Sequence, residues 1–187
     1  MEKLLAEYLE EGRQHMQKAI EHLNNELSHI RAGKASPEML KDIKVDVYGA
    51  TTPLQHVANI SLVDSRTIAI QPWDKSQLKA IEHAIFASNL GITPMNDGEF
   101  IRLTVPPLTE ERRINLVKQA KQYGEDARVS LRSTRHKLLE FIKNEVKEGY
   151  PEDAGKRKEK EVEDMVHEFD AKIKDLLEAK EKEIMTV

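Results

Sequence analysis

The chain has 187 residues and is acidic, with 29 Lys and Arg against 33 Asp and Glu for a net charge of −4. This length allows one domain or two small ones, and the absence of cysteine excludes disulfides and cysteine-ligated zinc. No stretch approaches the roughly 20 apolar residues that span a membrane, and the N-terminus carries charge where a secretory signal needs an apolar run. We therefore expect a soluble protein of the cytoplasm.

A first long helix is predicted from the N-terminus, because apolar or small residues recur there in steps of four and three. They are Leu5, Leu9, Gly12, Met16, Ala19, Leu23, Leu27 and Ile30. Gly33 is expected to cap this helix and Pro37 to stop it. Three histidines on it recur every seven residues, about 10 Å apart along the axis and too far to share a metal ion, so we expect surface histidines and no metal site.

The segment between the first two long helices has a different character, since six of the seven prolines lie there together with alternating apolar runs. Strands are predicted at 43–47, 57–62, 67–70 and 100–105. One helix is expected among them, starting with Asp74 and Gln77 as a capping box and ending at Gly91. Residues 37–105 therefore predict a small mixed α/β domain inserted into a helical bundle.

Two chain crossings, at 33–36 and 105–108, would join the domains, and paired crossings restrict motion to a hinge. Glycine widens and proline restricts the backbone conformations that are available at such joints. The candidate hinge residues are Gly33, Ala35, Ser36, Val105, Pro106, Pro107 and Leu108. We expect two rigid domains at a variable angle.

A second long helix is predicted from Thr109, a suitable N-cap, to about Glu148, with Glu110 and Glu111 placed favourably in its first turn. Gly149 and Pro151 would end it, with Pro151 in the first turn of a third helix. The seam of that helix is Val162, Val166, Phe169, Ile173, Leu176 and Ile184. The predicted fold class is α+β, with residues 1–32 and 108–187 forming a bundle of three long helices.

Four cations on the second helix, Lys121, Arg128, Arg132 and Arg135, are spaced by seven, four and three residues and so share one face. We call them the cationic row. Between Arg112 and Lys137 there are 8 cations and 2 anions, against the acidic trend of the chain. Apolar residues of the same helix form a different stripe about a quarter turn away. The row favours a polyanionic partner, and an ordinary solvated helix face is the alternative.

No motif for catalysis is present. The run 33–36 faintly resembles a phosphate-binding loop, but Ser28 stands where that pattern needs glycine, and neither a nucleophile elbow nor a dinucleotide fingerprint appears. The chain therefore predicts a binding protein that is not an enzyme and needs no cofactor. Only Tyr123 offers an aromatic ring near the row, which favours the phosphate backbone of structured RNA over stacked single strands.

Four separated segments, 30–37, 89–98, 107–113 and 127–135, resemble the ribosome recycling factor family. The resemblance covers essentially the full length. It implies an L-shaped molecule with a three-helix bundle and a β/α/β lobe, which binds the large ribosomal subunit after termination. With elongation factor G, which hydrolyses GTP, such a protein splits the ribosome into subunits.

The resemblance also implies contacts with 23S-type ribosomal RNA through Arg31, Arg128, Arg132 and Arg135. Lys34 stands where the family usually has arginine, Ser133 where it has asparagine, and His136 where it has another basic residue. Lysine lacks the bidentate fork and histidine is mostly neutral at pH 7, so weaker contacts are expected at Lys34 and His136.

The expected mechanism is mechanical: the bundle presents the cationic row to RNA, and the smaller lobe swings on its hinge under force from the partner. A monomer is expected. One alternative is a coiled-coil adaptor or structural protein, because the first and third helices have heptad-like spacing. Another is a generic structured-RNA-binding protein. The hypothesis requires guanidinium groups displayed outward from an unbroken helix rather than paired with acids of the same chain.

Overall fold

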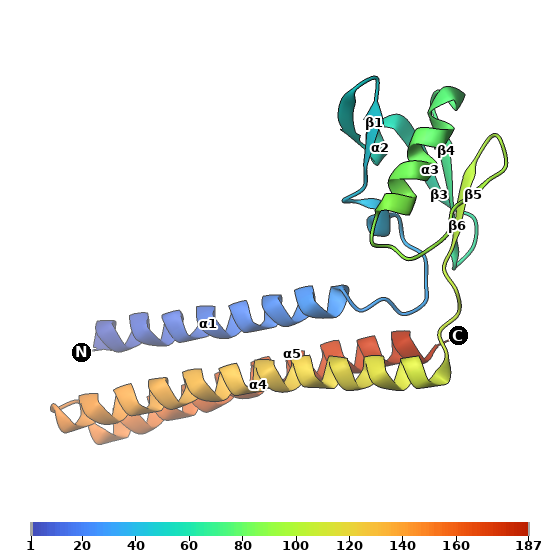
Figure 1. Ribbon diagram of the computed structural model, residues 1–187. Coiled ribbons are helices and arrows are strands. Elements are labelled where there is room, and N and C mark those ends of the chain that lie inside the picture. The colour runs from blue at the N-terminus through green and yellow to red at the C-terminus, as the bar shows by residue number, and fades with distance from the viewer. Residues whose placement is uncertain (1, 187) are drawn as a thin grey trace. The chain divides into compact units, whose positions relative to one another are not determined.

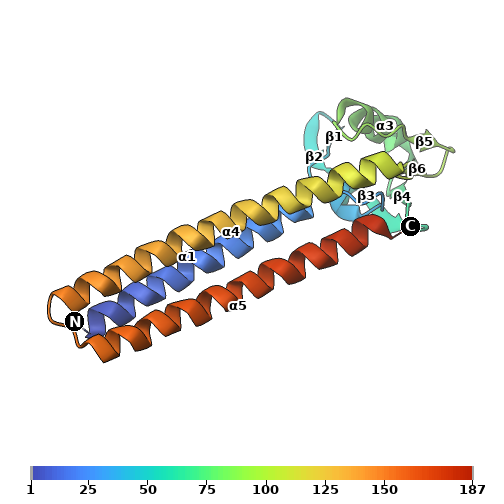
Figure 2. The same cartoon turned by 90° about the horizontal axis from the view of Figure 1, so that it is seen from below.

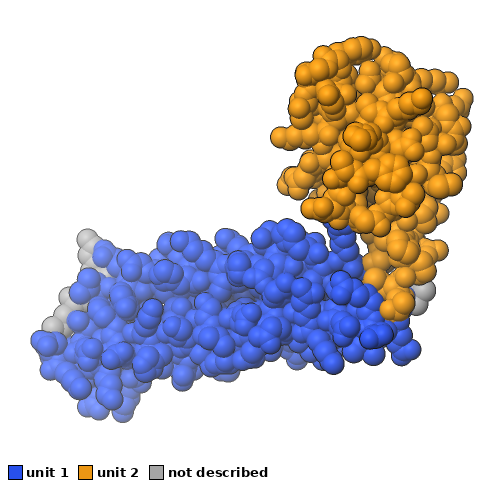
Figure 3. Space-filling model, in the orientation of Figure 1, with its two compact units in different colours: residues 1–32, 110–187 blue, residues 33–109 orange. Residues whose placement is uncertain are grey.

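The computed structural model describes residues 2–186, and the side chains of residues 4–186. It divides into two compact units, which Figure 3 shows in different colours: unit 1 is Met1–Ala32 with Glu110–Val187, and unit 2 is Gly33–Thr109. No helix of the described residues is long and apolar enough to cross a membrane. The α+β class predicted from the sequence is confirmed, with long helices in unit 1 and a small sheet in unit 2.

Unit 1 consists of three long helices: α1 (Glu2–Ser28), α4 (Glu110–Lys147) and α5 (Glu152–Met185). Both views show them running side by side (Figures 1 and 2). The 38 residues of α4 form one continuous helix, about 57 Å long at 1.5 Å per residue. The requirement for an unbroken helix is therefore met.

The predicted seams form the core of this bundle, because each long helix buries one apolar stripe against the other two. Leu5, Met16, Val162, Phe169 and Ile173 are almost fully buried. Ala19, Val166 and Leu176 lie only at its margin. Ile20 and Met165 are buried beside the predicted positions, which shows that a helical stripe is wider than a strict heptad seam.

Glycines let α4 and α5 approach closely and so fix their register. A Cβ on Gly124 would lie 2.4 Å from Leu177 Cδ1, and one on Gly155 would lie 2.6 Å from Val146 Cγ2. Both distances are too short for a real contact, so an added Cβ would force the Leu177 or Val146 side chain to shift. The register sets which residues of α5 face the cationic row.

Unit 2 is built on a four-stranded antiparallel sheet in the order β3-β4-β6-β5. Its strands are β3 (Ala58–Leu62), β4 (Thr67–Pro72), β5 (Met95–Asn96) and β6 (Ile101–Thr104). A separate hairpin joins β1 (Lys44–Val47) to β2 (Ala50–Pro53). Three short helices, η1 (Pro37–Leu40), α2 (Leu54–Val57) and η2 (Lys75–Gln77), and the longer α3 (Leu78–Ala87) complete the unit.

An aliphatic core holds unit 2 together. Ile68, Ile70, Ile81, Ile101 and Leu103 are all 0–1% exposed, and they come from β4, α3 and β6. This matches the predicted alternation of the strands, since every second residue points to one face of a sheet. The unit therefore has its own core, as an independent compact unit needs.

Both ends of unit 2 are tied to the turn between β3 and β4. The N–H of Ala35 donates to the carbonyl of Ser65 at 2.8 Å, and the N–H of Val105 donates to that of Arg66 at 2.7 Å. Ala35 also belongs to the apolar core. These anchors place Ala35 and Val105 inside the folded part of unit 2.

Several predicted boundaries were wrong. Helix α1 ends at Ser28, before Gly33, which has a positive φ of 76° in the segment that follows. Helix α3 ends at Ala87, before Gly91, and Pro151 is the N-cap of α5 rather than a residue of its first turn. Strands β2 and β5 were not predicted, because β2 is mostly polar and β5 has only two residues.

Candidate nucleic-acid interface

Three members of the cationic row line depressions between α4 and α5. Lys121 and Arg128 line one depression together with Lys174 and Leu177 of α5, and Arg135 lines a second one further along α4. Lys121 and Arg132 are exposed, whereas Arg128 and Arg135 are partly covered. The apolar residues Ala127, Leu131 and Leu138 are buried in the bundle, so the row is separate from the core, as predicted.

All three arginines of the row are paired with carboxylates of the same chain. Arg128 Nε donates to Asp170 Oδ1 at 3.1 Å. Arg132 Nη2 donates to Glu125 Oε1 at 2.7 Å, and Arg135 Nε donates to Glu163 Oε1 at 2.8 Å. The expectation that these guanidinium groups are free of intramolecular partners was therefore wrong. Its main cause is the register of α5, which places Asp170 and Glu163 opposite the row.

These ion pairs are exposed enough to be exchanged for another anion. The paired side chains keep 33% to 59% of their surface accessible, and pairs in that environment are worth about 0–1 kcal/mol each. The pKa of Arg135 is raised, first by its hydrogen bond to Glu163 and then by the attraction of that carboxylate. Each of the three arginine pairs is therefore individually weak.

Four lysines extend the cationic surface beyond Arg135, and the sequence pattern had not drawn attention to them. They line the same depression as Arg135 and are Lys143, Lys147, Lys156 and Lys160. Among the described residues, none of the four side chains has an ion-pair or hydrogen-bond partner, although Glu140, Glu159 and Glu163 line the same depression. Each helix carries two of them four residues apart, a like-charge spacing that is unfavourable on an isolated helix and that could have revealed them.

The remaining predicted contact residues, Arg31 and Lys34, lie outside α4, whereas the departures Ser133 and His136 lie on it. Arg31 follows α1 in unit 1, and Lys34 belongs to unit 2; both side chains are exposed. Ser133 is exposed on α4. On the same helix, His136 Nε2 lies 3.8 Å from Glu140 Oε2. The structure thus groups Lys121, Arg128, Arg132 and Arg135 on one helix and leaves Arg31 outside it.

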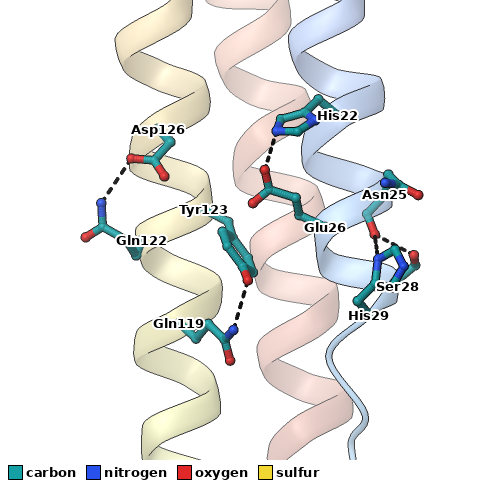
Figure 4. A network of polar contacts seen from close by, with 9 residues as sticks. All are labelled: His22, Asn25, Glu26, Ser28, His29, Gln119, Gln122, Tyr123 and Asp126. Carbon is teal, nitrogen blue, oxygen red and sulfur yellow. Dashed lines mark hydrogen bonds and ion pairs between the residues drawn. The ribbon is translucent and has the colours of Figure 1, made fainter. Parts of the chain in front are cut away.

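The polar contacts on another part of α1 and α4 are local to each helix (Figure 4). His22 pairs with Glu26 one turn along α1, and Gln119 donates to Tyr123 Oη at 2.9 Å on α4. The histidines of α1 are exposed, as predicted. No group of three or more His, Asp or Glu suited to a metal ion is found among the described residues. The pairs of Arg128 and Arg135, which join α4 to α5, differ from this network in that respect.

Comparison with known proteins gives a consistent result over nearly the whole chain. The family model described as "Ribosome recycling factor" matches residues 23–185. The ribosome-recycling factor of Porphyromonas gingivalis is 50% identical over 184 residues, covering 98% of this chain and 99% of that protein. That of Phocaeicola vulgatus is 49% identical over 179 residues, covering 96% of each.

Solved structures agree with the sequence relatives. A solution structure of a ribosome recycling factor matches with a TM-score of 0.74 and 39% identity over 98% of both chains. A second match, with a TM-score of 0.61 and 44% identity, covers 97% of this chain and 99% of the other. It describes models for the T. thermophilus ribosome recycling factor and the E. coli elongation factor G bound to the E. coli post-termination complex.

The fold is that of an α+β translation factor with a long helical bundle and a small β-containing unit. The chain belongs to the ribosome recycling factor family.

Proposed function

We propose that this protein binds the large ribosomal subunit of post-termination complexes. Together with elongation factor G, and with GTP hydrolysis by that partner, it separates the ribosome into subunits for a new round of translation. Family membership over nearly the full chain supports this function, as does the similarity to a factor described in a post-termination complex with elongation factor G. The protein acts in the cytoplasm as a monomer and, as a binding protein rather than an enzyme, needs no cofactor of its own.

The cationic row supplies the principal contact with ribosomal RNA. Because the three arginines are paired with acids of the same chain, the argument from charge alone fails. Family membership carries this proposal, and the continuity of α4, which holds four cations on one face of an unbroken helix, supports it. A rigid row of that kind suits the phosphate backbone of structured RNA, which attracts cations without requiring base readout. Arg31 and Lys34 add contacts outside the row, and the lysines beyond Arg135 extend it.

We propose a shorter joint between the two units than the segments 33–36 and 105–108. Ala35 and Val105 are hydrogen-bonded within unit 2, and Ser36 accepts a hydrogen bond from the N–H of Glu38. We therefore place the hinge at Gly33 and Lys34 on one crossing and at Pro106, Pro107 and Leu108 on the other. A Cβ on Gly33 would lie 3.0 Å from Leu108 Cγ, so the two crossings approach each other there.

A subunit-splitting assay tests this function. Post-termination ribosomes are incubated with elongation factor G and GTP, with and without this protein, and free large subunits are measured by sedimentation. We expect free subunits only when protein, elongation factor G and hydrolysable GTP are all present. Equal splitting without the protein, or an obligate dimer that does not sediment with large subunits, would contradict the proposal and favour an adaptor.

A further inference from the structure

Two carboxylates of α5 repeat the spacing of two arginines of α4. Arg128 and Arg135 are seven residues apart, and their partners Asp170 and Glu163 are also seven apart on the antiparallel helix. At 1.5 Å per residue, either separation is about 10 Å along the axis. The acids therefore form a short anionic series that matches these two arginines one for one.

Carboxylate and phosphate oxygens make the same kind of bond to a guanidinium group. Both accept charge-assisted hydrogen bonds from the planar donors of arginine. In the free protein, Arg128 Nε donates to Asp170 at 3.1 Å, and Arg135 Nε donates to Glu163 at 2.8 Å. A phosphate that binds either arginine through those donors must displace the carboxylate or share the guanidinium with it.

We propose that Asp170 and Glu163 are intramolecular competitors of the RNA phosphates. This inference rests on the proposed function and adds a regulatory element to it: the two carboxylates hold the affinity of the row below the value that its arginines could reach. A factor that acts on many ribosomes in turn must leave each large subunit, and an internal anion that recaptures the arginines favours release.

The test uses amide variants that remove charge and keep shape. Asp170→Asn and Glu163→Gln are compared with Glu168→Gln as a matched control. Glu168 is also a carboxylate of α5 with about half of its side chain exposed, and it pairs with Arg13 of α1 at 3.0 Å rather than with the row. All three variants change the net charge equally. Affinity for purified large subunits is measured at several salt concentrations.

We expect Asp170→Asn and Glu163→Gln each to raise the affinity about two- to fivefold at low salt, through slower dissociation, as is typical of exposed ion pairs. Glu168→Gln should change it much less. In an Arg128→Ala background, the gain from Asp170→Asn should fall to the level of the control, because the arginine that it releases is gone. Circular dichroism melts establish that each variant is folded.

Three outcomes would overturn the inference. Unchanged or lower affinity in both amide variants would mean that the carboxylates position the arginines or have no role. An equal gain in Glu168→Gln would indicate a general charge effect. A full gain in the Arg128→Ala background would mean that Asp170 repels RNA directly. The proposed function fails separately, when post-termination ribosomes with elongation factor G and GTP release free subunits equally with and without this protein.

Discussion

Arg135 on α4 and Glu163 on α5 are joined through two nitrogens that converge on one oxygen. Nε donates to Glu163 Oε1 at 2.8 Å, and Nη2 lies 2.7 Å from the same atom. This is the geometry of a planar guanidinium group and cannot be reproduced by the single ammonium of lysine. The same guanidinium group thus pairs α4 with α5 and belongs to the row that is proposed to bind RNA.

Arg135→Lys should therefore weaken binding to large subunits while keeping the charge. We expect a decrease of about three- to tenfold, smaller than for Arg135→Ala, because lysine binds phosphate as a point charge without the fork. Equilibrium binding at fixed salt measures the difference. Equal affinity of the lysine variant and the parent would show that only the net charge of this position matters.

Acid should destabilise unit 2 through three aspartates whose pKa values are lowered. In each case the largest cause is a hydrogen bond from a backbone N–H, which favours the charged form: Arg66 for Asp64, Ser76 for Asp74, and Phe100 for Asp97. A carboxylate with a depressed pKa contributes stability above its unfolded value of 3.8, and this stability is lost as pH falls through the lower folded value.

We expect urea unfolding midpoints to fall as pH decreases from 5 to about 2, and to fall less in Asp97→Asn, which has no charge to titrate at that position. The N–H groups of Glu99 and Phe100 both donate to Asp97 Oδ1, at 3.0 and 2.8 Å. A pH dependence identical in parent and variant would show that this carboxylate makes no contribution.

Gly149→Ala should destabilise the bundle. Gly149 has a φ of +107° between α4 and α5, a conformation that alanine rarely adopts, although no atom lies within 4 Å of the added Cβ. We expect a decrease of about 1–2 kcal/mol in the free energy of unfolding, all of it from the backbone. Denaturant titration measures it, with the exposed neighbour Glu148→Ala as a control. A decrease below about 0.5 kcal/mol, the usual range for surface substitutions, would contradict the explanation.

Distances between the two units should vary in solution. The chain has no cysteine, so dyes can be attached at Thr51→Cys in β2 and Ser130→Cys in α4, both exposed positions. We expect a broader distance distribution for this pair than for Ser133→Cys with Lys174→Cys, which both lie in unit 1. Replacing Pro106 and Pro107 by glycine should broaden it further. Equal widths for the two pairs would exclude a hinge at the proposed joint.

The sequence predicted the long helices and the row because both depend on residues close together along the chain. The N-cap Thr109 and the breakers Gly149 and Pro151 placed α4 within one residue at its start and end. The spacing of Arg128, Arg132 and Arg135 predicted their common face. The ion partners were beyond this reasoning. Glu163 and Asp170 are 28 and 42 residues from their arginines, and only the register of two packed helices brings them together.

The short elements of unit 2 show a second limit. Tyr48 has a positive φ of 50° in the turn between β1 and β2, a conformation more often signalled by asparagine or glycine, so this hairpin had no clear sequence pattern. Strand β2 is Ala-Thr-Thr-Pro and lacks apolar alternation. Its pairing with β1 depends on tertiary context, which local propensity does not encode.

The salt dependence of large-subunit binding tests the central claim most directly. The variant Arg128→Ala/Arg135→Ala is compared with the parent and with Arg13→Ala, an ion-paired arginine of α1. We predict that the double variant binds more weakly and that its slope of log affinity against log salt is smaller by roughly two units, one for each phosphate that is no longer neutralised. Unchanged affinity and slope in a folded double variant would contradict the account and leave the row as solvated surface.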